Sequence, residues 1–270
     1  MSADPRAVES LLAFWADAGV EALYAEAPVD RMARGIEALR PRLPPALAPA
    51  PPVARASLAP PPEIAGAVEA ARAAAAAAST LTELEAAIAA FEGCALRYAG
   101  ASRAVFSRGV PGAPVMVIGE GPGAEEDAQG APFVGRAGKL LDRMLAAAGL
   151  EARVFITNTV FWRPPGNRDP TPAEQAACAP FLERAIALVN PRFLLLAGGS
   201  SAKSVLKRAE GILSIRGRWF EWRSADGALE LPALPTLHPA FLLRQPGAKK
   251  KAWEDLLTLT ERLDRPARPT

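Results

Sequence analysis

Residues 115–138 read VMVIGEGPGAEEDAQGAPFVGRAG, and this stretch decides the fold class of the 270-residue chain. Its first four residues, 115–118, are apolar and mostly β-branched, and they end abruptly at the glycine-rich segment 119–123. The pattern predicts a buried strand that runs into a tight loop at the carboxyl end of a parallel sheet. In open α/β folds, that edge of the sheet carries the ligand-binding crevice.

Two side chains stand out in the loops of this stretch. Glu120 lies among residues too small to cover it, and Phe133 lies between a proline and glycines. A carboxylate and a ring in neighbouring loops suit a flat, uncharged heterocycle better than a phosphate. The spacing is not that of a dinucleotide-binding fingerprint, and no GK[ST] follows to complete a phosphate-binding P-loop. An ordinary tight turn without a ligand stays open at this point.

The pattern outside this stretch alternates between strands and helices. Strands are expected at 154–157, 193–197 and 233–237, and helices at 138–148, 172–189, 200–209 and 251–263. This order predicts an α/β fold, a three-layer α/β/α sandwich around a mainly parallel four-stranded sheet. Residues 217–222 alternate in polarity and predict a short edge strand or hairpin.

Three segments are expected along the chain. Residues 1–40 show helical apolar spacing and predict an N-terminal helical extension. Residues 41–62 are rich in proline and alanine, which predicts an extended, semi-rigid linker. Residues 63–270 form the main domain, including two leading helices at 63–78 and 81–91.

The composition permits a nucleic-acid partner without requiring one. The formal net charge is +2 and the estimated pI is 8.7, which is mildly basic. Two cysteines imply no disulfide framework and fit a reducing cytoplasm. No apolar run approaches the roughly 20 residues needed to span a bilayer. We expect a cytoplasmic monomer with no membrane partner.

Two further side chains are placed where predicted strands end. Asn158 follows the second strand, and His238, the single histidine of the chain, follows the last. An amide both donates and accepts, as reading the O4 and N3–H edge of a pyrimidine requires. Each residue alone has an ordinary structural interpretation, as a turn former or a core histidine. Their convergence with Glu120 on one rim of the sheet favours a functional site.

The segment after His238 combines apolar residues with cations. Leu242 and Leu243 precede Arg244, and Lys249 opens a run of three lysines. An exposed apolar tip beside cations suits a wedge that enters a base stack while the cations contact phosphates. A helix with a solvated basic face is the alternative.

Four motifs occur together in the region from about residue 80 to the C-terminus. They are GEGPGAEEDAQGAPFVGRAGKLLD (119–142), FITN with RPPGNRDPTPAE (155–174), IRGRWFEW (215–222) and LHPAFLLRQP (237–246). With these motifs the chain resembles the uracil-DNA glycosylase superfamily, most closely its family 4. The resemblance implies a uracil-DNA glycosylase catalytic domain over 63–270.

The resemblance also implies roles for individual residues. Glu120 would position the attacking water, and a neutral His238 would donate to uracil O2 as charge develops on the leaving base. The implied uracil-binding set is Gly119, Gly121, Phe133 and Asn158, with Phe133 stacking on the flipped base and Asn158 reading its edge. Leu242 would fill the gap in the duplex, and the implied DNA contacts also include Arg163, Arg244 and Lys249.

Family 4 members commonly hold a four-iron, four-sulfur cluster on four cysteines. Only Cys94 and Cys178 match those positions here, while Phe91 and Trp162 align with the other two. A cubane cluster needs a ligand for each iron, and an aromatic ring cannot serve. We therefore expect no iron–sulfur cluster and no metal, with the two cysteines as remnants of a cluster site.

The leading hypothesis is a DNA repair glycosylase that hydrolyses the N-glycosidic bond of deoxyuridine in single- or double-stranded DNA. It would release uracil and leave an abasic site, as in base excision repair. The alternative is a non-catalytic binder of uracil-containing or single-stranded DNA on the same fold. A nucleotide-binding domain of a cofactor enzyme is disfavoured, because no phosphate loop and no ribose-binding acid are found.

Overall fold

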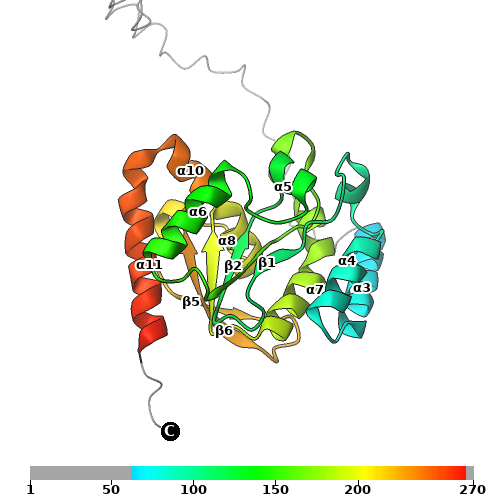
Figure 1. The fold of residues 1–270 in the computed structure, drawn as a ribbon. Helices are drawn as coiled ribbons and strands as arrows, with labels where there is room; N and C mark the ends of the chain where they lie inside the picture. Colours follow the sequence, from blue (N-terminus) through cyan, green and yellow to red (C-terminus); the bar gives the residue numbers. More distant parts are fainter. Residues whose placement is uncertain (1–61, 266–270) are drawn as a thin grey trace, which may run out of the picture. The chain divides into compact units, whose positions relative to one another are not determined.

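The computed structural model describes residues 62–265 (Figure 1). The predicted extension at 1–40 and nearly all of the predicted linker at 41–62 lie outside these residues. The described part contains a six-stranded sheet in the order β1-β3-β2-β4-β6-β5. The strands are β1 (Ser107–Gly109), β2 (Val115–Gly119), β3 (Val154–Asn158), β4 (Phe193–Ala197), β5 (Phe220–Arg223) and β6 (Glu230–Thr236).

The prediction of four strands is wrong in number, because the sheet has six. The four expected strands are the central ones, and they run parallel to one another. β1 and β5 are antiparallel edge strands. β5 overlaps the edge strand expected at 217–222 and begins three residues later, whereas β1 has only three residues and no apolar alternation that would reveal it.

The sheet is covered by helices on both faces, which gives the expected three layers (Figure 1). Along β2, Met116 and Ile118 pack into one buried cluster while Val115 and Val117 pack into another, as the period of a strand requires. The first cluster joins the sheet to α3 (Pro62–Ala77), α4 (Leu81–Ala90), α7 (Pro172–Val189) and α8 (Gly199–Leu206). The second joins it to α6 (Arg136–Ala147) and α11 (Lys249–Asp264).

Local signals in the sequence explain several helix ends. Thr80 caps α4 by accepting from the backbone N–H of Glu83, and Thr171 with Glu174 forms a capping box at the start of α7. α7 matches its predicted range, and Pro180 lies inside it. α8 ends three residues before the predicted boundary, since Lys207 adopts a left-handed conformation with φ 53°.

Short helices were not predicted from the sequence. α5 (Ala124–Gln129), α9 (Ile212–Ile215) and α10 (Pro239–Arg244) each occupy a loop at the carboxyl edge of the sheet or beside it. Three 3₁₀ turns accompany them, at Ala95–Tyr98, Pro165–Asn167 and Pro246–Ala248.

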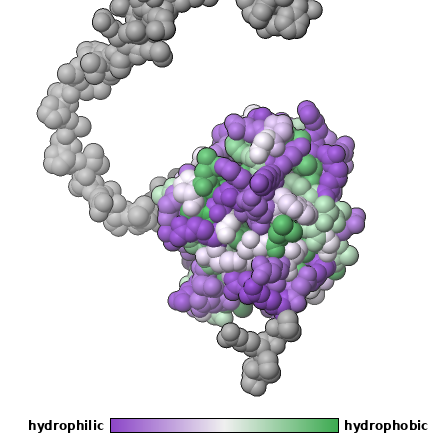
Figure 2. Space-filling model, turned by 90° about the vertical axis from the view of Figure 1, so that its left-hand side faces the viewer, coloured by the Kyte–Doolittle hydropathy of each residue, from purple (hydrophilic) through white to green (hydrophobic). Residues whose placement is uncertain are grey.

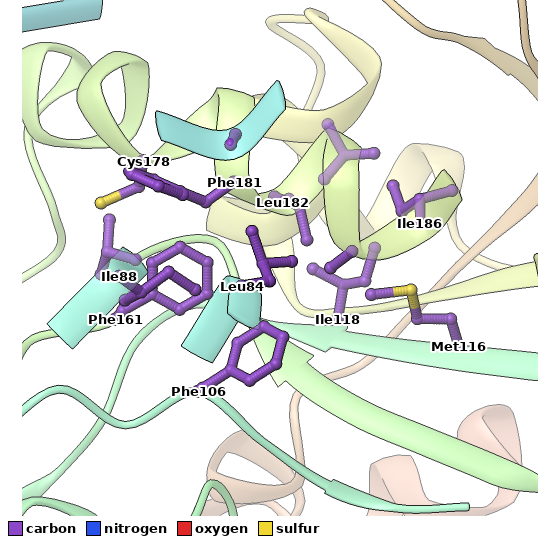
Figure 3. Packing of buried hydrophobic residues seen from close by; sticks show 14 of the residues in the cluster. Leu84, Ile88, Phe106, Met116, Ile118, Phe161, Cys178, Phe181, Leu182 and Ile186 are labelled. Atoms are coloured by element: carbon purple, nitrogen blue, oxygen red, sulfur yellow. The ribbon is translucent and has the colours of Figure 1, made fainter. Parts of the chain in front are cut away.

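The larger buried cluster contains the most aromatic packing (Figure 3). Phe161 packs edge-to-face against Phe181 and Trp162, and Cys178 lies among these rings. The face on which α11 lies is covered mostly by hydrophilic side chains (Figure 2). Among the described helices, none has the length and apolar character needed to cross a membrane.

Candidate active site

A cavity of about 1050 Å³ opens at the carboxyl edge of the parallel strands. The strand order changes direction beside β2, because β3 follows on one side and β4 on the other. Such a switch point separates the loops of neighbouring strands and leaves a crevice between them. Six of the predicted site residues line the cavity: Glu120, Gly121, Phe133, Asn158, His238 and Arg244.

Gly119 lies where the side chains of Phe133 and Asn158 approach each other most closely. It pairs with Asn158 across β2 and β3. A Cβ atom at Gly119 would lie 2.4 Å from Asn158 Oδ1 and 2.5 Å from two ring atoms of Phe133. The amide and the ring therefore approach each other over a position that only glycine leaves free.

The loop that carries Phe133 is held in an unusual conformation. Phe133 has φ 55°, in the left-handed region, and its ring is 6% exposed. A Cβ atom at Gly138 would lie 1.6 Å from the carbonyl oxygen of Phe133, so the start of α6 can approach this loop only with glycine there. Strained backbone held by its surroundings is typical of residues that act on a ligand.

Two charged side chains fix the same loop. The carboxylate of Glu126 accepts from the backbone N–H groups of Gly123, Val134 and Gly135 at 2.9–3.0 Å, which ties the glycine loop to the Phe133 loop. Arg108, on β1, donates to the carbonyl oxygens of Pro132 at 2.7 Å and Phe133 at 3.2 Å. The edge strand missed in the sequence thus has a role in positioning Phe133.

His238 is the N-cap of α10, and its surroundings determine its protonation. Its Nδ1 accepts from the backbone N–H of Ala240 at 3.2 Å, so in the neutral ring the proton lies on Nε2. The pKa of His238 is lowered to about 4, first by its removal from water and then by the charge of the nearby Arg244, while the charge of Glu126 acts in the opposite direction. At neutral pH the imidazole is therefore an uncharged donor through Nε2. Its ring centroid lies 5.6 Å from that of Phe133.

Glu120 is half-buried at the exit of β2. The pKa of Glu120 is raised to about 7, first by burial and then by the charge of the neighbouring Asp169 and a hydrogen bond with it. Ser200, in the first turn of α8, hydrogen-bonds the Glu120 carboxylate and opposes the rise. A carboxyl group with a pKa near 7 has the balance of basicity and ionisation that a general base at neutral pH needs.

The predicted DNA-contacting residues are divided between surface and interior. The expectation of an exposed Leu242 is wrong: its side chain is 0% exposed and packs with Leu140, Leu237 and Ala252. α10 continues the chain from His238 as a helix, and helical periodicity turns Leu242 inward. The half-buried Phe241 lines the cavity instead.

Of the three predicted cations, Arg244 alone lines the cavity. Arg244 is exposed and lines it, whereas Lys249 is exposed at the start of α11 and does not. Arg163 donates through Nε to Asn167 Oδ1 at 2.8 Å, within the loop that follows β3.

Sequence reasoning did not single out Asp169, Ser200 or Phe241. Asp169 lies inside the quoted motif RPPGNRDPTPAE, and Phe241 is inside LHPAFLLRQP. Ser200 follows β4, and the rule that drew attention to Asn158 and His238 applies to it as well. These residues were detectable as strand-end or motif positions, but no pattern along the chain indicates their contacts.

The residues around Cys94 and Cys178 do not fit a four-iron cluster. The two thiols lie 3.9 Å apart, and Phe91 and Trp162 belong to the same buried cluster. Over residues 62–265 no group of three or more His, Cys, Asp or Glu side chains could hold a metal ion. A cluster of this type requires four ligands, and this part of the core supplies two.

Comparisons with known proteins identify the family to which the chain belongs. The model of the family described as the uracil DNA glycosylase superfamily matches residues 106–257. A type-4 uracil-DNA glycosylase of Sulfurisphaera tokodaii is 39% identical over 175 residues, which cover 63% of this chain and 79% of that relative. Those of Pyrobaculum aerophilum and Saccharolobus solfataricus are 42% and 40% identical, over 53% and 59% of this chain and 74% and 76% of each relative.

Proposed function

The chain belongs to the uracil-DNA glycosylase superfamily, and we propose that its cavity hydrolyses the N-glycosidic bond of deoxyuridine in DNA. The protein is a uracil-DNA glycosylase, a hydrolase of N-glycosyl bonds that acts in DNA repair. The observation that carries the assignment to this cavity is that Glu120, Phe133, Asn158 and His238, from separate loops, line it together.

Recognition of uracil is assigned to Phe133 and Asn158. The buried ring of Phe133 offers a flat face on which an extruded base stacks. The Asn158 amide meets the base edge with one acceptor and two donors, and cytosine presents the opposite order of donors and acceptors. Cytosine is then excluded, because binding it would leave buried polar groups without hydrogen-bond partners.

Bond cleavage places charge at two points, and the cavity has a group for each. As the C1′–N1 bond breaks, its electron pair passes to the base, and the Nε2–H of His238 donates to the developing anion at O2. The sugar becomes an oxocarbenium ion, which the ionised Glu120 stabilises. Water, oriented by the same carboxylate, then attacks C1′ and loses a proton to it.

The cavity is larger than a free base needs, and its rim suits DNA. Phe241 provides an apolar side chain at the edge, and the cations Arg244 and Lys203 accompany it. We assign to Phe241 the apolar contact that fills the gap left by the flipped nucleotide, and to Arg244, Arg163 and Lys249 contacts with phosphates.

We further propose that the protein functions without an iron–sulfur cluster. Support comes from the ligand set, since two thiols and two aromatic rings cannot bind four irons. None of the groups invoked in cleavage belongs to that buried cluster.

A glycosylase is distinguished from a non-catalytic binder by a single assay. The protein is incubated with an oligonucleotide that contains one uracil, and alkali then converts abasic sites to strand breaks. Breaks are expected with the wild-type chain and are lost in Asn158→Ala, which should still bind DNA and melt at the wild-type temperature. Binding without breaks would support the alternative, a reader of uracil-containing DNA.

A further inference from the structure

We propose that Leu213, on α9, contacts the base pair that flanks the flipped nucleotide when the protein acts on duplex DNA. The inference rests on the proposed function and deepens it, because it adds a contact that only the duplex supplies. Single exposed apolar residues are ordinary on a protein surface. Leu213 differs in its place, since its neighbours in the chain, Gly211 and Ile212, line the cavity. The large apolar side chains that are exposed within residues 62–265 are Tyr98, Val110, Leu213 and Leu257.

The short helix α9 is packed against the core, so it presents Leu213 from a defined position. Ile212 packs against the first residue of α8, since a Cβ atom at Gly199 would lie 3.6 Å from the Cβ atom of Ile212. Ile215 is buried in the larger cluster. Residues three apart lie on the same face of a helix, so Ile212 and Ile215 turn inward together. Leu213 lies on another face and is 67% exposed.

The segment after α9 is fixed as well. The backbone N–H of Gly217 donates to the carbonyl of Pro235, on β6, at 2.9 Å. Arg216 donates through Nε to Oδ2 of the buried Asp255, on α11, at 3.1 Å. Because the backbone on both sides of Leu213 is already held, a contact with DNA there needs little ordering of the protein.

Leu213 continues an apolar ridge, which we define as Phe241, Ile212 and Leu213. Phe241 and Ile212 both line the cavity, and both pack against the buried cluster that contains Leu237 and Leu242. Phe241 is the residue to which the gap left by the flipped nucleotide is assigned. Consecutive Cα atoms are about 3.8 Å apart and neighbouring base pairs about 3.4 Å apart. A side chain one residue beyond the cavity lining is therefore within reach of the next base pair.

The charge around the ridge favours DNA over a second copy of the chain. Lys203 and Arg244 are exposed and line the cavity, and the exposed Lys207 ends α8. Within residues 62–265 these three cations form no salt bridge, whereas Glu210, the acid closest to α9 in the chain, is paired with Arg208. A two-fold contact between copies would bring like charges together, while phosphates would neutralise them.

The acids of the cavity lie in other segments than the ridge and its cations. Glu120, Glu126 and Asp169 follow β2 or β3, whereas Lys203 and Arg244 follow β4 and β6. In the sheet, β3 lies on one side of β2, and β4 and β6 lie on the other. The cations therefore share with the ridge the half of the rim that lies beyond β2.

The test compares excision from single-stranded and duplex oligonucleotides that carry one uracil. Leu213→Ala should lower kcat/KM about three- to tenfold on duplex DNA and leave it within about twofold on single strands, because the flanking base pair exists only in the duplex. Leu213→Met keeps an apolar side chain of similar volume and should retain duplex activity within about twofold. Leu257→Ala shortens an exposed leucine of α11 that does not line the cavity, and it should match wild type on both substrates.

Binding is measured without turnover on a duplex that carries a tetrahydrofuran analogue of the abasic site, by fluorescence anisotropy. Leu213→Ala should raise Kd about three- to tenfold, and its urea unfolding curve should coincide with that of wild type because the side chain is exposed. Sedimentation velocity of wild type and Leu213→Ala shows whether two copies associate through this residue.

The possible outcomes separate the inference from the proposed function. If wild type excises uracil and Leu213→Ala matches it on duplex DNA, the inference fails and the proposed function stands. An equal loss on both substrates would also overturn the inference, since the contact would then not depend on the duplex. A wild-type dimer that Leu213→Ala converts to monomers would place Leu213 between copies of the chain and overturn it too. Absence of excision by wild type on either substrate would overturn both.

Discussion

Substitution of Gly119 by alanine tests whether the cavity depends on the close approach of Phe133 and Asn158. The added methyl would lie 2.5 Å from the Phe133 ring and 2.4 Å from Asn158 Oδ1. Ordinary carbon–carbon contacts are about 3.5–4.0 Å, so the ring must move by about 1 Å. The carbonyl of Phe133 packs against Gly138 and accepts from Arg108, so the ring must move while its backbone stays in place.

The magnitude follows from this displacement. A misplacement of about 1 Å in a site that orients a substrate costs about 100-fold in rate. Overpacking costs about 1–3 kcal/mol of stability, which is less than the 5–15 kcal/mol typical of a folded domain. Gly119→Ala should therefore fold and lose about 100-fold in kcat/KM.

The assay is excision from an oligonucleotide with one uracil, with a urea unfolding curve for each variant. Gly66→Ala is the matched control, because a Cβ atom at Gly66, in α3, meets nothing within 4 Å. Gly66→Ala should keep full activity, and its free energy of unfolding should increase by about 0.5–1 kcal/mol. If Gly119→Ala folds and excises uracil within threefold of wild type, the proposed arrangement of the pocket is refuted.

Three further results are expected. Burial holds the pKa of Glu120 at about 7, above its ordinary 4.5, so its ionisation opposes folding as pH rises through 7. In urea unfolding, Glu120→Gln should raise the free energy of unfolding by about 1 kcal/mol at pH 8, a value discounted for solvent screening, and by almost nothing at pH 4. An equal increase at both pH values would contradict this. Leu242→Ala should lower the free energy of unfolding by about 2–5 kcal/mol. Phe241→Ala should keep the wild-type stability but excise uracil from duplex DNA less well than from single strands. The reverse pattern would show that Leu242 is the residue that enters the duplex. Purified protein should contain far less than stoichiometric iron and sulfide, measured colorimetrically, and a full complement would show that Cys94 and Cys178 find other ligands.

The sequence revealed the parts of the fold in which a local pattern and the tertiary structure agree. The apolar runs that begin at Val115 and Phe193 are strands because they are buried on both faces, and continuous hydrophobicity marks such strands. β1 carries no such signal, since it is a short edge strand held by pairing with β3. α10 was missed because Pro239 suggests a loop, although proline is favoured in the first turn of a helix.

The same distinction applies to the site. Glu120, Asn158 and His238 were detectable because each follows a strand, and parallel strands bring their ends to one edge. The contact between Glu120 and Asp169 was not detectable from the sequence, because it depends on how the loop after β3 folds back across the cavity. The exposure of Leu242 was predicted wrongly for a related reason. It depends on α10, a helix that the local sequence does not indicate.

The aromatic cluster and the cavity are linked through the segment after β3, and this link bears on the proposal that the protein functions without an iron–sulfur cluster. The backbone N–H groups of Thr159 and Val160 donate to the carbonyls of Gly119 and Glu120, at 3.0 and 3.3 Å. Phe161 and Trp162 then enter the core and are almost fully buried.

A ligand bond at the position of Trp162 would anchor this segment to a cluster. Here the anchor is packing, since Phe161 contacts Trp162 and Phe181 edge-to-face. Such pairs contribute about 0.5–1.5 kcal/mol each beyond the area they bury, and truncating a buried tryptophan typically costs about 3–5 kcal/mol. Packing of this strength supports the proposal that the segment which positions Asn158 is held without iron.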